Sequence, residues 1–266
     1  MGHNLRLIRV LPSDSQSSAE SNHEHKNYWG VSSCVQNLFS VHWLGSSIPS
    51  DRRTSNSWAT STDSIHDRGN VRYKAGLTAG SLKVPESRVV ADLLLQGVDD
   101  LGWREAMFRE NVLQTRSPQT AKRLRTLLRH RLETMDADLW RMIRDGSVTV
   151  ATHACFAAAI KHSPLLGDFL DLVVRDQYKL FRESLTKKLW GDYIEGCRGR
   201  DPEMPWWSES TVARLRSSVF QILAQAGYIH DTASMKLQTV HIAAPVLKYL
   251  EDHDEQYVLR CIQVGK

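Results

Sequence analysis

Apolar residues recur at helical spacing along most of the chain from residue 85 onward. Pro85 suits the first turn of a helix, and an apolar stripe then runs from Val89 to Leu94 and stops at Gly97. The same spacing predicts further helices over residues 99–110, 117–132, 136–144, 148–162, 163–177, 186–193 and 208–226, and near 245–251. The pattern therefore predicts a mainly α fold.

Capping residues fix the ends of several of these helices. Ser117-Pro118 and Ser163-Pro164 each pair an N-cap residue with a proline in the first helical position, which is a specific start signal. Ser208 caps the helix that Gly227 ends. Residues 196–202 read as a loop and as the best internal boundary, with Trp206 and Trp207 expected to pack one domain against the next.

The C-terminal part has a different pattern. Short β-type runs at residues 228–229 and 237–242 enclose a polar turn at 231–234, and residues 257–262 also read as a strand. A helix followed by two short strands is the outline of a winged helix that carries a short β-hairpin. We therefore predict a helical domain over residues 71–200, which contains the basic helix 117–132, and a winged-helix-like domain over 201–266.

Residues 1–67 differ in kind from the rest. Fifteen of them are Ser, and their apolar residues never settle into a helical or strand period, so we expect a poorly ordered extension. After Met1 the next methionine is Met107, while Val71 is a residue that a GTG start codon would encode. A start site placed too early is therefore one hypothesis for this segment.

The composition says more about the cellular compartment of the protein than about its binding partner. The formal net charge of +4 is too small to identify a ligand class by itself. The four cysteines lie far apart without a CxxC pair, which favours reduced thiols, and no apolar run is long enough to span a bilayer. The N-terminal residues do not have the continuous apolar stretch of a secretory signal peptide. We therefore expect a cytoplasmic protein.

The strongest charge signal lies on the helix 117–132. At 100° per residue, Ala121, Leu124, Leu128 and Leu132 form its buried stripe, and Lys122, Arg125 and Arg129 follow one exposed edge, with Gln119 and Arg123 beside them. A row of this kind can contact phosphates along a nucleic acid, but it also suits an ordinary solvated helix face. The stretch holds six Lys or Arg residues and no acidic residue, namely Arg116, Lys122, Arg123, Arg125, Arg129 and Arg131.

A second candidate face lies on the helix after Ser208. Ser210, Arg214 and Gln221 lie opposite its apolar stripe, and Lys187 with Lys188 precede it and could add phosphate contacts. Winged helices are also common protein-docking modules, so both interpretations stay open. The segment from Lys74 to Gly80 contains glycines that could approach a phosphate, but it lacks the spacing of a phosphate-binding loop and reads as an entry segment.

Catalytic constellations are hard to find. Neither HExxH nor GxSxG occurs. Asp168 and Asp171 lie on one helix face, which a charged surface explains, and His153 and His162 are nine residues apart on one helix, too far for joint metal ligation. We therefore expect no enzyme activity, no metal and no cofactor.

Several segments in a fixed order resemble the BrxA family, the small accessory proteins of bacterial BREX phage-defence systems. The resemblance covers residues from about 73 to 250. It rests on the segments YKAGLTAGSL at 73–82, ESR at 86–88, NVLQTRSPQTAKR at 111–123, HSPLL at 162–166, DFL at 168–170 and WSEST at 207–211.

The resemblance implies a compact helical protein with winged-helix character, similar to the antitermination factor NusB, that binds double-stranded DNA without catalysis. It also implies partners in the same system, namely an adenine-specific DNA methyltransferase and a large ATPase, and no membrane. The segment from Ser117 to Arg123 becomes an expected DNA contact. The candidate DNA-binding residues are Arg116, Ser117, Gln119, Thr120, Lys122, Arg123, Arg125, Arg129, Lys187, Lys188, Ser210, Arg214 and Gln221.

Two alternatives stay open beside DNA binding. The same helical faces could dock the methyltransferase or another defence component, in which case the protein is an interaction scaffold. A winged helix could instead read one operator and regulate transcription.

Overall fold

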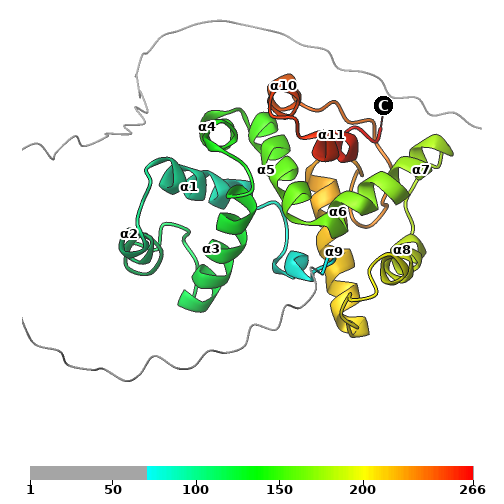
Figure 1. The fold of residues 1–266 in the computed structure, drawn as a ribbon, viewed down its shortest axis with the longest axis horizontal. Helices are drawn as coiled ribbons and strands as arrows, with labels where there is room; N and C mark the ends of the chain where they lie inside the picture. The colour runs from blue at the N-terminus through cyan, green and yellow to red at the C-terminus, as the bar shows by residue number, and fades with distance from the viewer. Residues whose placement is uncertain (1–70, 266) are drawn as a thin grey trace, which may run out of the picture. The chain divides into compact units, whose positions relative to one another are not determined.

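The mainly helical fold predicted from the apolar spacing is confirmed in the computed structural model, which describes residues 71–265 (Figure 1). None of the described helices is long and apolar enough to cross a membrane. The 3-10 helix is η1 (Gly76–Ala79), and the π-helices are η2 (Glu105–Arg109) and η3 (Phe169–Val174). The α-helices are α1 (Val84–Leu95), α2 (Asp100–Arg104), α3 (Pro118–Leu132), α4 (Ala137–Asp145), α5 (Val148–His162), α6 (Pro164–Asp168), α7 (Arg175–Lys179), α8 (Lys187–Arg200), α9 (Glu209–Gln225), α10 (Ala244–Asp252) and α11 (Gln256–Ile262).

Helix α5 is the element around which the others pack. Its residues 153–160 are all buried, and α1, α3, α4, α6, α10 and α11 contact it. Most of these buried side chains are small, so neighbouring helices approach closely on every side. A helix that is apolar all round must lie inside the fold, and α5 therefore holds the surrounding helices in place.

Aromatic packing joins the two halves of the described chain. The ring of Phe169 in η3 lies 5.2 Å from those of Trp190 and Tyr193 in α8, and 6.1 Å from that of Phe220 in α9. One hydrophobic core contains residues from both sides of residue 200. The division into domains 71–200 and 201–266 stays a prediction, and the extension 1–67 lies outside the described residues.

The loop predicted at residues 196–202 is wrong over most of its length, because α8 continues to Arg200. Cys197 is fully buried on the same helix face as Tyr193, so packing outweighs the roughly 1 kcal/mol that each glycine costs within a helix. The packing role expected of Trp206 is also wrong. Its side chain is 82% exposed and lies under the Arg198 guanidinium, whereas Trp207 packs against the core.

The strand expected at 257–262 is a helix, α11, because Val258, Leu259, Cys261 and Ile262 are buried at helical spacing. The described residues contain no strands, only two isolated antiparallel bridges. One bridge joins Ile229 to Leu237, at the position predicted for the hairpin, and is flanked by hydrogen bonds from the His230 amide to the Lys236 carbonyl and from the Gln238 amide to the Tyr228 carbonyl. The chain therefore reverses direction there without forming a sheet.

A buried histidine fastens α5 to the segment before α10. The Nδ1 atom of His153 accepts a hydrogen bond of 3.0 Å from the Ala243 amide, which requires this nitrogen to be unprotonated. The side chain is buried, and burial lowers the pKa of His153 below its usual value. Folding therefore favours the neutral ring.

We expect the free energy of unfolding to fall as the pH is lowered through about 6.5, the pKa of an unperturbed histidine. Below that pH the unfolded chain binds a proton on His153 that the folded chain does not bind, so protonation favours unfolding. Urea unfolding at pH 7 and pH 5 measures the loss. The His153→Gln variant should lose less stability than the parent between these two values, and an equal loss in both would contradict the assignment.

Candidate nucleic-acid interface

The start of α3 is fixed by the residues ahead of it. Ser117 has an extended backbone, its hydroxyl accepts a hydrogen bond of 3.2 Å from the Thr120 amide, and Pro118 takes the first helical position. Upstream, the Asn111 side chain accepts a hydrogen bond of 3.0 Å from the Thr115 amide. The N-cap predicted at Ser117 is confirmed. Its hydroxyl lies 2.9 Å from that of Thr120, so these two candidate DNA donors already contact each other.

The buried stripe predicted for α3 is confirmed, because Ala121, Leu124, Leu128 and Leu132 are all buried. They pack toward α5, α1 and η1, which all contact α3. The opposite side of the helix is therefore turned to solvent, as an interface with a large polyanion requires.

The basic residues of α3 separate into two groups rather than one row. Gln119, Lys122 and Arg123 face a surface cavity, and Lys122 and Arg123 are exposed. The guanidinium carbons of Arg125 and Arg129 instead lie 5.9 Å and 5.1 Å from the ring centroid of the buried Trp103. These cation–π contacts hold Arg125 and Arg129 against α2.

Arg129 is also neutralised by acidic side chains. Its Nε lies 2.6 Å from Glu133 and its Nη1 lies 3.5 Å from Asp100. The hydrogen bond to Glu133 raises the pKa of Arg129. By contrast, Arg116, Lys122 and Arg123 are exposed and form no ion pair with a carboxylate among residues 71–265. The charge available to a ligand is therefore concentrated at the N-terminal half of α3.

The last basic residue of the sequence pattern, Arg131, is buried rather than exposed. Only 2% of it is accessible, and its Nη1 donates a hydrogen bond of 3.0 Å to the Ser81 carbonyl. Within the described residues its Nε and Nη2 have no hydrogen-bond partner. Burial lowers the pKa of Arg131 to about 10. This guanidinium therefore lies inside the fold and is not exposed to a ligand at the surface.

The cavity beside α3 has a volume of about 1210 Å³. Three segments that are distant in sequence form its walls: residues 71–76, the exposed face of α3, and residues 161–164 at the junction of α5 and α6. The segment 71–76 leads into η1, which contacts both α3 and α9 (Figure 1). The cavity is thus a product of the tertiary fold and not of any one helix.

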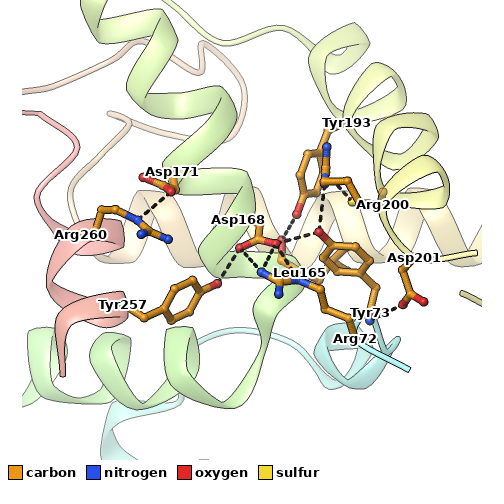
Figure 2. A network of polar contacts seen from close by, with 11 residues as sticks. Arg72, Tyr73, Leu165, Asp168, Asp171, Tyr193, Arg200, Asp201, Tyr257 and Arg260 are labelled. Atoms are coloured by element: carbon orange, nitrogen blue, oxygen red, sulfur yellow. Dashed lines mark hydrogen bonds and ion pairs between the residues drawn. The ribbon is translucent and has the colours of Figure 1, made fainter. Parts of the chain in front are cut away.

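One buried carboxylate attaches the segment 71–76 to the body of the protein (Figure 2). Asp168 is 5% exposed and accepts hydrogen bonds from Arg72 at 2.8–3.1 Å, from the Tyr73 hydroxyl at 2.7 Å and from the Tyr257 hydroxyl at 2.8 Å. The surface position expected for Asp168 is therefore wrong. Asp171 is partly buried and pairs with Arg175 and Arg260.

Tyr73 extends this network to the end of α8. Its amide donates a hydrogen bond of 3.1 Å to Asp201, and its hydroxyl accepts one of 3.1 Å from Arg200 (Figure 2). The hydrogen bond from Arg200 and the contact with Asp168 occupy both sides of the hydroxyl. Since the side chain of Arg72 and both the backbone and the side chain of Tyr73 are held, the cavity wall formed by residues 71–76 has a defined position.

The second candidate face forms beside α8 and α9. Lys187 and Gln221 line one cavity of about 380 Å³ together with Arg216 and Ser217. Ser210 and Arg214 are exposed on α9 as predicted, but they do not line that cavity. Lys188 is paired with Asp192 at 2.9 Å, which reduces the charge that it can offer.

One group of potential metal ligands occurs among the described residues, namely Asp136, Asp138 and His253. Asp136 caps α4, because its Oδ1 accepts hydrogen bonds from the amides of Asp138 at 3.0 Å and Leu139 at 3.4 Å. Its Oδ2 lies 2.8 Å from Nε2 of His253. Capping and this pair account for the cluster.

Comparison with known proteins identifies the family. The family model described as BrxA matches residues 71–254. The chain belongs to the BrxA family. A curated protein named BREX protein BrxA, from Paramagnetospirillum magneticum (strain ATCC 700264 / AMB-1), is 58% identical over 194 residues, which are 73% of this chain and 98% of the relative.

Two further matches agree with this membership in the BrxA family. BREX protein BrxA from Escherichia coli O9:H4 (strain HS) is 33% identical over 187 residues, which are 70% of this chain and 88% of the relative. A solved structure described as that of an uncharacterized protein from Magnetospirillum magneticum has a TM-score of 0.68 at 55% identity. The match covers 73% of this chain and 99% of that one.

Sequence reasoning missed part of the cavity wall of this BrxA-family member. The local pattern places Lys74 in an entry segment and gives no ligand role to His130, Lys161 or His162, yet all four line the cavity with Lys122. A signal was present in the sequence: SPQTAKR and HSPLL, two of the segments that carry the resemblance, both border this cavity. The tertiary fold brings these two segments together, although they are distant in sequence.

We expect the Asp168→Ala variant to lose about 3–5 kcal/mol of unfolding free energy, because it leaves buried donors without their acceptor. Urea unfolding followed by circular dichroism measures this loss. The matched control is Asp252→Ala, whose pair with Lys248 is exposed and should cost less than about 1 kcal/mol. Similar losses in the two variants would show that the network of Asp168 does not hold the fold together.

Proposed function

We propose that this BrxA-family protein is a non-catalytic accessory component of a BREX phage-defence system and that it binds double-stranded DNA. Its membership in the family and the names of its relatives support the place in defence. The DNA methyltransferase and the ATPase of the same system are its proposed protein partners, in the cytoplasm. A NusB-like arrangement of the helical body belongs to the same proposal.

The observation that carries the DNA proposal is the charge of α3. Arg116, Lys122 and Arg123 are exposed without a carboxylate partner among the described residues, and Gln119 and the start of the helix lie beside them. Cations arranged in this way replace the counterions of a phosphate backbone, and the released ions favour binding at low salt. Contacts of this kind position a protein on DNA without reading its sequence.

A second contact is proposed on α9. Helix α9 followed by the chain reversal at Ile229 and Leu237 has the order of a winged helix, with Ser210, Arg214 and Gln221 exposed on the helix. Lys187 lies beside Gln221 and adds a positive charge. In this proposal α9 supplements the affinity of α3.

Fluorescence anisotropy of the full-length protein with a labelled random duplex, from about 50 to 200 mM salt, tests this function. We expect steeply salt-dependent binding. In the triple variant Arg116→Ala, Lys122→Ala, Arg123→Ala the slope of log affinity against log salt should become shallower by about 0.9 for each phosphate that the protein no longer neutralises. The helical content measured by circular dichroism should stay unchanged, because all three side chains are exposed.

A second triple variant controls for net charge. Arg109→Ala, Arg141→Ala, Lys248→Ala also removes three positive charges, from exposed side chains that pair with acidic neighbours on their own helices. This control should bind the duplex as the parent does. Equal losses in both triple variants would reject an interface on α3. No binding at 50 mM salt would favour the interaction scaffold, and strong preference for one promoter would favour the transcription regulator.

A further inference from the structure

Half of the residues that line the cavity beside α3 carry basic or titratable nitrogen groups. Among the described residues its lining includes no Asp or Glu, whereas six basic or titratable nitrogen side chains face it in addition to Arg72. They are Lys74, Lys122, Arg123, His130, Lys161 and His162. Like charges gathered in one hollow repel one another, so an anion that entered would relieve the repulsion.

The acidic partners of two lining cations lie outside the cavity. Arg72 is held from behind by Asp168, and Lys161 pairs with Glu255. Lys74, Lys122 and Arg123 form no ion pair with a carboxylate among residues 71–265. The fold therefore balances the cations that build the wall and leaves three exposed cations for a ligand.

Among residues 71–265, two buried polar groups near the wall lack hydrogen-bond partners. The Nδ1 atom of His162 is inaccessible and has no hydrogen-bond partner within the described residues, and neither do Nε and Nη2 of Arg131, which is 2% exposed. Burial, together with the nearby charges of Arg131, His130 and Lys74, lowers the pKa of His162 to about 4. Of these two residues only His162 lines the cavity, and its neutral ring offers one hydrogen-bond donor and one acceptor.

We propose that this cavity binds a small organic polyphosphate of nucleotide size, such as a nucleoside triphosphate. Three cations and the hydroxyls of Thr126 and Ser163 suit several phosphate groups. A volume of about 1210 Å³ is far more than one phosphate needs and is larger than typical ligand cavities of roughly 300–1,000 Å³. Val71, Leu127 and Pro164 add apolar surface for the uncharged part of the ligand.

Isothermal titration calorimetry of the full-length protein with ATP, at about 50 mM salt, tests the proposal. ATP should bind, inorganic triphosphate should compete with it, and adenosine should not bind, because the phosphates supply the attraction. Lys74→Ala should weaken ATP binding about tenfold, the effect of removing one charge-assisted hydrogen bond. Arg141→Ala removes one exposed charge outside the cavity and should leave ATP binding unchanged.

A second variant tests the cavity itself without changing charge. Thr126 is exposed on α3 and lines the cavity, so Thr126→Trp fills it from a position that needs no repacking of the core. This variant should lose ATP binding with unchanged helical content. The proposal is overturned if ATP fails to bind at 1 mM, or if it binds Lys74→Ala and Thr126→Trp as tightly as the parent.

The same variants separate this site from the DNA interface. The cavity shares Gln119, Lys122 and Arg123 with the proposed DNA interface. Lys74 and Thr126 line the cavity and lie outside the set proposed to contact the duplex, so the proposal does not rest on DNA binding. Lys74→Ala should therefore weaken ATP binding and leave duplex binding as it is. If Lys74→Ala weakens duplex binding as much as it weakens ATP binding, the cavity holds DNA phosphates, and a site for a small ligand is rejected.

Discussion

The hydrogen bonds to the buried carboxylate of Asp168 are the interaction on which the candidate sites depend. A buried carboxylate is stable only when its oxygens are fully occupied, and here the donors come from two distant parts of the chain, Arg72 with Tyr73 and Tyr257. Their arrangement draws the segment before η1 and the start of α11 onto the end of α6. Together with the hydrogen bonds of Tyr73 to Asp201 and Arg200, this anchor fixes the segment 71–76 beside α3.

The anchor also explains how a cation-rich surface is compatible with a stable fold. Acidic side chains are not absent from this region, but they lie behind the cavity wall, as Asp168 does behind Arg72 and Glu255 behind Lys161. On α3 the carboxylates of Glu133 and Asp100 neutralise the C-terminal half only. Arg72 and Lys161 are thus neutralised in direct contact with their carboxylates. The positive charge left at the cavity comes from Lys74, Lys122 and Arg123.

Local signals in the sequence predicted the helices that carry the site. The Ser117-Pro118 cap, the stripe of Ala121 to Leu132 and the bounds of α5 follow from spacing and capping within one helix, which is why they are right. The same reasoning failed where packing overrides local preference, as at Gly196 in α8 and at residues 257–262.

The candidate site itself was only half predictable. Lys122 and Arg123 were found because they lie within a basic run, whereas Lys74 and His162 contribute from segments that only the tertiary fold brings together. The sequence pattern also could not show that Arg125 and Arg129 turn toward Trp103. Asp168 looked like a surface residue because its partner Tyr257 is 89 residues away and carries no motif.

The distance between the partners of Asp168 has a consequence for the nascent chain. Arg72 and Tyr73 leave the ribosome long before Asp168, and Tyr257 follows 89 residues after it. The carboxylate therefore lacks one of its donors until the segment of α11 has been synthesised. The anchor that holds residues 71–76 is thus complete only after residue 257 has been added to the chain, although every residue that lines the cavity has been synthesised earlier.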